Sequence, residues 1–201
     1  QHDDADITNL LKLREKLFKK NKFKISPLAY IVKCTAQTLK DFPEMNSSLS
    51  SGMDSLIYKE FYNIGIAVDT DAGLIVPNIK DTDKKSIIKI SAEINDLANL
   101  AKKRRLSNDH LSGTTFTVSS LSGVGGKYFT PIINPPEVGI LGLSKTYDAV
   151  KIEKMKLHTK KQLPLSLSYD HRVINGVYAV KFLTKLMQYL NDVKFLESSF
   201  E

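Results

Sequence analysis

One histidine of this chain stands where acid–base chemistry is most readily built. His171 follows the alternating apolar residues 163–169 and precedes a glycine and a helical pattern, so we expect it at a strand-to-helix junction. Such a junction can hold a side chain rigidly while one face stays open to a ligand. A histidine can accept a proton near neutral pH and return it later. The position alone leaves a catalytic base and a satisfied structural histidine equally open.

The remaining histidines and the single cysteine offer weaker candidates. His2 is terminal, His110 lies in a short polar helical segment, and His158 lies in a lysine-rich stretch that we expect between strands. Cys34 falls inside a predicted helix, where a small core residue is the favoured interpretation over a reactive thiol. One cysteine forms no internal disulfide and no multi-thiolate metal site, so we expect no metal and a reducing compartment such as the cytoplasm.

The elements that position these residues follow from apolar spacing. Apolar residues at helical intervals predict two helices near the start of the chain, with Asp6 and Ser26 as their N-caps and Pro43 ending the second. The next part is rich in β-forming residues and reads as a meander. We predict helices over 7–18, 27–42, 86–104, 108–111 and 176–190, and strands over 46–50, 56–59, 63–69, 74–80, 114–119, 138–145 and 163–169. The mixture indicates one α/β domain without the strict rhythm of a doubly wound fold.

Composition excludes several classes of protein. The 201 residues are 42% hydrophobic and 25% charged, which is ordinary for a globular domain and unlike a disordered or collagen-like chain. No apolar run reaches the length of a membrane span. Lysine and arginine outnumber the acidic residues by 29 to 22, but the lysines are dispersed and lack interleaved aromatic residues, so we expect no nucleic-acid partner. The chain begins without methionine, which fits a piece of a longer polypeptide.

The run DHRVING at residues 170–176 resembles the signature of the catalytic domain of the dihydrolipoamide acyltransferases, the core components of 2-oxoacid dehydrogenase complexes. Five further blocks are similar to the family in the family's order: residues 46–50, 63–70, 73–81, 116–120 and 131–145. Two of them, at 118–120 and 140–145, look most like the bacterial pyruvate-type members, which transfer acetyl groups. The family more commonly carries aspartate at position 175, where this chain has Asn175. An asparagine can still form hydrogen bonds there, but it cannot supply a negative charge.

The resemblance implies acyl transfer between the thiols of dihydrolipoamide and coenzyme A, both of them substrates. His171 would be the general base that activates the attacking thiol, and Ser119 would donate a hydrogen bond to the developing oxyanion without forming an acyl-serine. Strand alternation agrees, since Thr117 and Ser119 share one face while Ser120 points away. Asn175 completes the implied catalytic set. The resemblance assigns no coenzyme A contacts, although basic side chains are natural candidates.

The resemblance also implies an α/β two-layer sandwich with a mixed sheet, related to chloramphenicol acetyltransferase. The whole chain, 1–201, would be one acyltransferase catalytic domain, with the family's N-terminal arm, lipoyl domains and subunit-binding domain outside it. Family members form a homotrimer with active sites between subunits, so that Ser119 and His171 would come from different chains, and pyruvate-type bacterial trimers build a cubic core. The implied partners are lipoyl domains and the decarboxylase and dihydrolipoamide dehydrogenase components, with no membrane partner.

Three alternatives stay open. The first is succinyl or branched-chain acyl transfer in a related complex. The second is an O-acyltransferase of the chloramphenicol acetyltransferase type, but that motif usually has two tandem histidines, and Asp170 stands in place of the first. The third is a structural core without activity, which the presence of both Ser119 and His171 disfavours.

Overall fold

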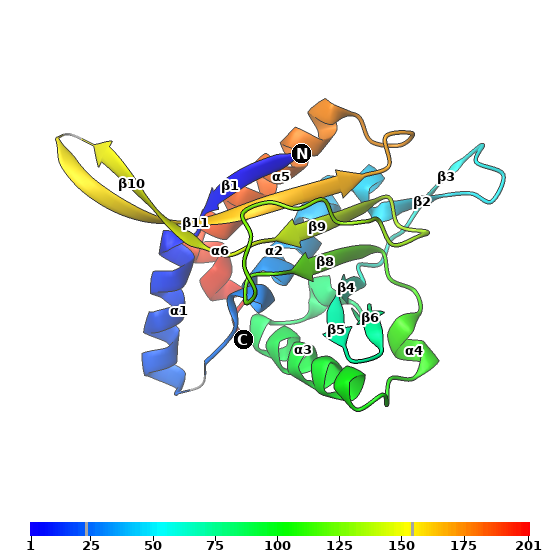
Figure 1. Ribbon diagram of the computed structural model, residues 1–201, viewed down its shortest axis with the longest axis horizontal. Helices are drawn as coiled ribbons and strands as arrows, with labels where there is room; N and C mark the ends of the chain where they lie inside the picture. Colours follow the sequence, from blue (N-terminus) through cyan, green and yellow to red (C-terminus); the bar gives the residue numbers. More distant parts are fainter. Residues whose placement is uncertain (23, 154) are drawn as a thin grey trace.

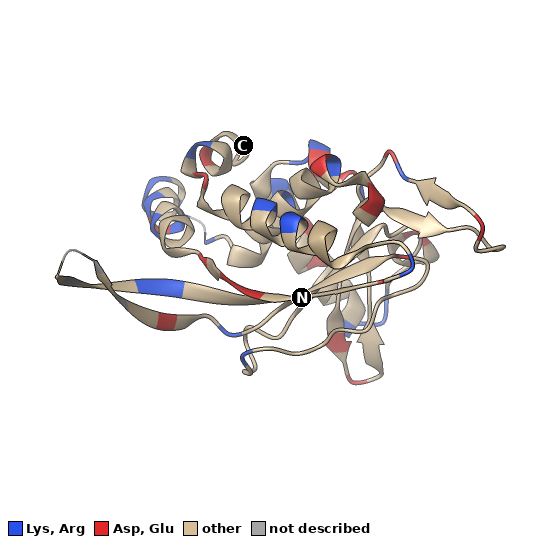
Figure 2. Cartoon of the chain, turned by 90° about the horizontal axis from the view of Figure 1, so that it is seen from above, with Lys and Arg blue, Asp and Glu red and all other residues tan. Residues whose placement is uncertain are grey.

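The computed structural model has two layers, with helices packed on one face of a twisted sheet (Figures 1 and 2). It describes residues 1–22, 24–153 and 155–201. The other face of the sheet carries loops rather than helices (Figure 2). The predicted two-layer α/β architecture with a mixed sheet is therefore confirmed.

The main sheet has seven strands in the order β1-β11-β9-β8-β4-β7, and β10 pairs with the first half of β11. Strands β4, β8 and β9 are parallel to one another, and the remaining pairs are antiparallel. The strands are β1 (His2–Asp6), β4 (Ile64–Ile66), β7 (Asn78–Ile79), β8 (Phe116–Ser120), β9 (Gly139–Leu143), β10 (Tyr147–Glu153) and β11 (Lys156–Tyr169). Two small hairpins stand apart from this sheet: β2 (Ser47–Leu49) with β3 (Leu56–Tyr58), and β5 (Val68–Thr70) with β6 (Gly73–Ile75).

The helices are α1 (Thr8–Asn21), α2 (Pro27–Asp41), α3 (Ile87–Lys102), α4 (Asn108–Leu111), α5 (Gly176–Asn191) and α6 (Val193–Ser198), with 3-10 turns η1 (Pro43–Asn46) and η2 (Thr82–Lys84). Ser26 caps α2 as predicted, because its hydroxyl accepts a hydrogen bond from Leu28 N at 3.3 Å. The expectation for Asp6 is wrong by one residue: Ile7 occupies the N-cap of α1, and the Asp6 carboxylate accepts from Thr8 N at 3.0 Å.

The core lies between the helices and the inner face of the sheet. Phe116 of β8 and Phe182 of α5 are fully buried, with ring centroids 5.8 Å apart. Cys34 is also fully buried within α2, and burial raises the pKa of its thiol, so the prediction of an inert core cysteine is confirmed. Among the described helices, none combines the length and apolar character that crossing a membrane requires.

Two predicted strands are interrupted, and two strands and an α-helix appear that were not predicted. Residues 74–80 divide into β6 and β7 around Pro77, which has no N–H to donate to a ladder. Residues 63–69 divide into β4 and β5 at Ala67, whose N–H bonds Val118 O at 3.0 Å. The additional elements are β1, β10 and α6. His158 therefore lies within β11, not between strands, and the lysine-rich composition of this stretch was a misleading sign of a connection.

Candidate active site

Ser119 lies near the carboxyl end of β8 and lines a cavity on the outer face of the sheet. Thr117, two residues earlier, lines the same cavity, whose volume is about 380 Å³. Most of the lining is apolar, including Phe129 and Ile140. Ser120 lines a different cavity, so the predicted alternation along this strand is confirmed. Among the described residues, Ser119 Oγ has no hydrogen-bond partner, which leaves its proton free for a ligand.

A glycine opposite Ser119 lets the cavity wall come close to the sheet. Gly142 of β9 is the register partner of Ser119. A Cβ atom at this position would lie 2.7 Å from Cζ of Phe129 and 3.2 Å from the carbonyl oxygen of Ser166. The phenyl ring therefore rests directly on the backbone of β9, and any larger residue at position 142 would push it away from the cavity.

His171 lies in the turn that joins β11 to α5. The turn is fixed by backbone hydrogen bonds: Asp170 N donates to Val138 O at 2.8 Å, and the N–H groups of Val173 and Ile174 donate to Asp170 O. Ile174 is fully buried and anchors the end of the turn. His171 itself is exposed, and its ring centroid lies 5.6 Å from that of Tyr169. The backbone is thus held in place while the imidazole stays open to a ligand or another chain.

Asp170 and Arg172, on either side of the histidine, form a multiply hydrogen-bonded ion pair. Arg172 Nη2 lies 2.6 Å from Asp170 Oδ2, and Arg172 Nε lies 2.9 Å from Oδ1. These hydrogen bonds lower the pKa of the Asp170 carboxyl group. This ion pair braces the turn that presents His171.

Asn175 caps the helix that follows. Its Oδ1 accepts a hydrogen bond from Tyr178 N at 2.9 Å, which satisfies one of the free N–H groups at the start of α5. Gly176 is the first residue of that helix. The side-chain NH₂ group of Asn175 has no hydrogen-bond partner in the described part of the chain and is available to donate to a ligand.

Sequence reasoning missed a buried carboxyl group close to this region. Glu137 is 4% exposed, and its Oε1 accepts a hydrogen bond from Asn134 Nδ2 at 2.8 Å. Burial raises the pKa of the Glu137 carboxyl group, and the Asn134 hydrogen bond and the Lys59 ammonium group offset that rise in part. Glu137 lines a cavity together with Asp170 and Arg172, whereas Asn134 lines the Ser119 cavity. One acidic residue in the proline-rich and apolar stretch 131–143 was the only available signal.

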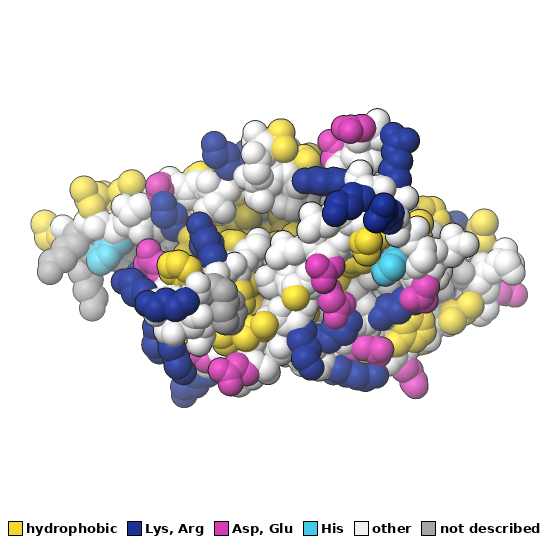
Figure 3. Space-filling view, turned by 90° about the horizontal axis from the view of Figure 1, so that it is seen from below, with side chains coloured by type: hydrophobic (Ala, Val, Ile, Leu, Met, Phe, Trp, Pro, Cys, Tyr) yellow, Lys and Arg dark blue, Asp and Glu magenta, His cyan; other side chains and the backbone are white. Residues whose placement is uncertain are grey.

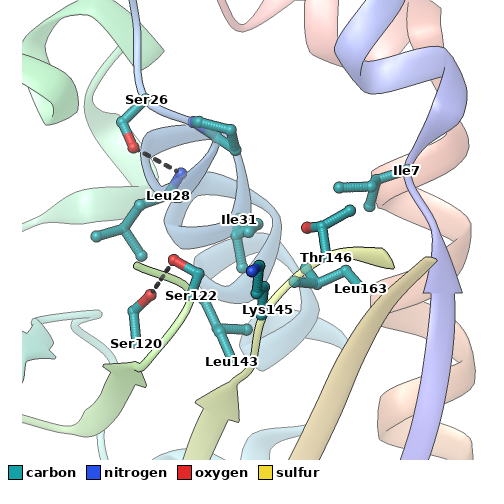
Figure 4. A pocket seen from close by; sticks show the side chains of 11 residues that line it. Ile7, Ser26, Leu28, Ile31, Ser120, Ser122, Leu143, Lys145, Thr146 and Leu163 are labelled. Carbon is teal, nitrogen blue, oxygen red and sulfur yellow. Dashed lines mark hydrogen bonds between the residues drawn. The ribbon is translucent and has the colours of Figure 1, made fainter. Parts of the chain in front are cut away.

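A second cavity, of about 340 Å³, lies at the carboxyl ends of β8 and β9 beside the start of α2 (Figure 4). Figure 4 shows that four hydroxyl groups and one lysine are among the side chains that line it: Ser26, Ser120, Ser122, Thr146 and Lys145. Ser120 and Ser122 hydrogen-bond one another at 2.9 Å between their Oγ atoms. Lys145 is exposed and makes no ion pair within the described residues. The cation and hydroxyl groups make this cavity suitable for an anionic ligand.

Ser119 and His171 of one chain do not meet. Ser119 is level with Gly142 of β9, which is level with Ser166 of β11. Tyr169 lies three positions after Ser166 on β11, which is about 10 Å along the strand. Since β11 is two strands away from β8 and His171 follows Tyr169, His171 lies still further from Ser119. The two residues therefore occupy opposite ends of the sheet, and a site that uses both needs two copies of the chain.

Comparison with known proteins gives a consistent set of relatives. The family profile of the 2-oxoacid dehydrogenases acyltransferase (catalytic domain) matches residues 1–197. The acetyltransferase component of the pyruvate dehydrogenase complex of Cupriavidus necator is 46% identical over 96% of this chain, and that of Buchnera aphidicola from Acyrthosiphon pisum is 43% identical over 98%. The chain spans 35% and 51% of the lengths of these two curated relatives.

Solved structures agree. The dihydrolipoamide acetyltransferase of Azotobacter vinelandii superposes with a TM-score of 0.92 at 41% identity, covering 98% of this chain and 82% of that one. A structure described as the cubic core of the pyruvate dehydrogenase multienzyme complex gives 0.92 at 42% identity, with the same coverage. A chloramphenicol acetyltransferase superposes with a TM-score of 0.63 at 10% identity, covering 94% of this chain and 86% of its own, which confirms the expected fold.

Proposed function

This chain belongs to the catalytic-domain family of the 2-oxoacid dehydrogenase acyltransferases, and on that premise we propose that it transfers acetyl groups between dihydrolipoamide and coenzyme A. The observation that carries the proposal is the agreement of the curated relatives. Eight of them, 37–46% identical over 94–98% of this chain, are named as the dihydrolipoyllysine-residue acetyltransferase component of a pyruvate dehydrogenase complex.

Residue spacing supports the catalytic assignment. The Azotobacter vinelandii structure comes from an investigation of the roles of a serine, a histidine and an asparagine in the catalytic mechanism of that enzyme. Its serine and histidine are separated by the same number of residues as Ser119 and His171 here. Its asparagine follows the histidine at the same interval as Asn175 follows His171. All three types and both intervals therefore recur in this chain.

The chemistry that these groups support is direct thioester exchange. His171 takes the proton from the attacking thiol, and the resulting thiolate adds to the thioester carbonyl carbon. The Ser119 hydroxyl donates a hydrogen bond to the oxyanion, where a fixed donor is worth roughly 3 kcal/mol of barrier. When the tetrahedral intermediate collapses, the carbon–sulfur bond to the departing thiol breaks and that thiol takes the proton back from the imidazolium. Neither side chain becomes acylated.

The distance between the two residues requires that each site be shared. In this proposal the imidazole of one copy reaches the Ser119 cavity of the next, and copies close into a trimer. Trimers joined further would give a larger core such as the cubic one of the solved relative. The acyl carrier would be a lipoyl group on a separate domain, and the decarboxylase and dihydrolipoamide dehydrogenase components would be partners of the assembled complex, which we place in the cytoplasm.

The Lys145 cavity provides a candidate site for the phosphate-bearing end of coenzyme A. Its hydroxyl groups can donate hydrogen bonds to an anion, and its lysine supplies a positive charge. The cavity lies at the same end of β8 as Ser119, on the opposite face of the sheet. A ligand that passes around this end of β8 would present its thiol on the Ser119 face of the sheet while its phosphates remain near Lys145 on the other face.

The test is transfer of acetyl from acetyl-coenzyme A to free dihydrolipoamide, measured in parallel for the parent chain and His171→Ala. Loss of a general base should lower turnover by about 100-fold or more. Sedimentation of both proteins supplies the control, because equal assembly ties the loss to chemistry. Undiminished turnover in the variant would remove His171 from the mechanism, and a parent chain that assembles without transferring acetyl would contradict the activity.

A further inference from the structure

The Ser119 cavity is uncharged and mostly apolar. Lysine and arginine side chains are prominent on the surface of the molecule (Figure 3), but the described residues that line this cavity include no charged one. Its polar side chains are those of Thr117, Ser119 and Asn134. In an apolar binding site, a few polar groups fix the orientation of the ligand and provide specificity. These three side chains therefore decide which polar groups of a ligand the cavity accepts.

Asn134 carries a hydrogen-bond acceptor whose orientation is fixed by a buried neighbour. Its Nδ2 donates to Glu137 Oε1 at 2.8 Å, and the backbone N–H of Glu137 donates to Asn134 O at 3.0 Å. Glu137 is buried, so the residue that holds the amide is itself held by the core. Because the NH₂ group is used, Asn134 Oδ1 turns the other way. This oxygen is accessible and has no partner among the described residues.

Asn134 and Ser119 are separated along the direction of the strands. Asn134 is bound to Glu137 just before β9 begins at Gly139, whereas Ser119 is level with Gly142, about 10 Å further along that strand. Between them, the cavity is lined by the register pair of Thr117 and Ile140 and by other apolar side chains. A ligand that reaches both polar groups is therefore elongated and apolar in its middle part.

The acyl carrier of the proposed function, on which this step rests, has this chemistry. Dihydrolipoamide is an uncharged hydrocarbon arm with thiol groups at one end and an amide at the other. We propose that this arm lies along the Ser119 cavity and that Asn134 Oδ1 accepts a hydrogen bond from its amide N–H. Asn134 is then a specificity-determining residue and Glu137 its positioning residue. A site built to accept a hydrogen bond discriminates against an analogue that has no N–H to donate.

An amide-to-ester exchange in the carrier tests this hydrogen bond. The N-methylamide and the methyl ester of dihydrolipoic acid are both uncharged and similar in shape, and they differ in an N–H group that the ester replaces by oxygen. With acetyl-coenzyme A as donor, we expect the parent to show about tenfold lower KM for the amide, and Asn134→Ala to show a difference of about twofold or less. Coenzyme A also carries amides, but its KM should be unchanged in the variant. An amide preference that survives in Asn134→Ala, or a rise in KM confined to coenzyme A, overturns the proposal.

Two further variants separate the acceptor from the fold. Asn134→Asp keeps an oxygen acceptor, because a proton shared with the Glu137 carboxyl group can replace the NH₂ donor, and it should keep most of the amide preference. Asn95→Ala, at an exposed asparagine of α3 outside the lining of the cavity, is the matched control and should match the parent. The KM ratio compares two ligands on one protein sample, so partial unfolding does not change it. Equal loss of preference in Asn134→Asp and Asn134→Ala would overturn the acceptor role.

Calorimetric binding of the same two ligands distinguishes failure of this contact from failure of the proposed function. A parent chain that binds the amide more tightly than the ester, with the difference lost in Asn134→Ala, supports the contact even if no acetyl is transferred; the absence of transfer then contradicts the function alone. A parent chain that transfers acetyl without preferring the amide, in turnover or in binding, overturns the contact and leaves the function standing.

Discussion

Ser119 and His171 lie at opposite ends of one sheet. Ser119 shares a level with Ser166 through Gly142, whereas His171 follows Asp170, whose N–H bonds Val138 just beyond the start of β9. No side-chain rotation can span a separation of more than about 10 Å along the strands. Under the proposed function, catalysis by this pair would therefore require an assembly of chains, and this relationship gives the sharpest test of the mechanism.

Mixing two inactive variants should restore activity. Ser119→Ala and His171→Ala each remove one half of every site, so each protein alone should be nearly inactive. After the two are dissociated and reassembled together in equal amounts, some interfaces combine an intact serine with an intact histidine. Random mixing predicts about one quarter of the parent turnover, because each site draws its two residues from independent copies.

The double variant Ser119→Ala/His171→Ala mixed with the parent is the matched control for this complementation. Its copies contribute neither residue, so activity should fall with dilution of the parent and never exceed the parent contribution. If the two single variants show no recovery although mixed assemblies form, both residues act within one chain or one of them has no catalytic role.

Ser119→Ala should affect turnover far more than binding. Its hydroxyl lies in a mostly apolar cavity with no described hydrogen-bond partner, so its hydrogen bond forms with the ligand and strengthens as charge develops on the oxygen. We expect kcat to fall roughly 100-fold with little change in KM for either substrate. Steady-state kinetics separate the two constants, and a loss confined to KM would assign Ser119 to ground-state binding.

Helix boundaries were well predicted where a local signal existed. Ser26 and Ser86 both accept hydrogen bonds at the start of their helices, because capping depends on residues within one turn. The hairpin of β10 and residues 156–162 of β11 was missed although residues 150–153 and 155–158 alternate apolar and polar, because their many lysines favoured a connection between strands.

The candidate site was predictable residue by residue but not as an arrangement. The alternation of side chains along a strand predicted which face of the sheet Ser119 occupies, and the strand-to-helix junction after residues 163–169 indicated His171 as a candidate base. The order of strands in a sheet is set by long-range pairing, so local periodicity could not reveal that the two residues lie apart. The burial of Glu137 likewise follows from tertiary packing around one acidic residue.

Asn175 can be tested for chemistry separately from capping. Asn175→Ala removes the acceptor for Tyr178 N and should lower the free energy of unfolding by about 1 kcal/mol. Asn175→Asp keeps an N-cap acceptor and adds a charge that the helix N-terminus favours, so stability should be retained. Thermal unfolding measures both. If Asn175→Asp is as stable as the parent but transfers acetyl more slowly, the side-chain NH₂ group contributes to the reaction.

Lys145 provides a test of where coenzyme A binds. Removing the ammonium group in Lys145→Gln should raise KM for coenzyme A about fivefold to tenfold, the scale of one exposed charge-assisted hydrogen bond, with kcat little changed. Lys145→Arg keeps the charge and should remain close to the parent. Raising the ionic strength should shrink the difference between parent and Lys145→Gln. Equal KM values for all three proteins at low salt would place the phosphates elsewhere.

Glu137 links stability to pH with a sign opposite to that of most carboxyl groups. Burial raises its pKa in the folded state, so the folded protein binds this proton more tightly than the unfolded chain does. The stability contributed by this group is complete below the unfolded pKa and is lost as pH rises through the folded pKa. Glu137→Gln mimics the protonated form and keeps an acceptor for Asn134. Its thermal midpoint should therefore exceed that of the parent at about pH 8, and the difference should shrink towards about pH 4. If Glu137→Gln is instead less stable than the parent at high pH, attraction between the Glu137 carboxylate and the Lys59 ammonium group outweighs the cost of burial.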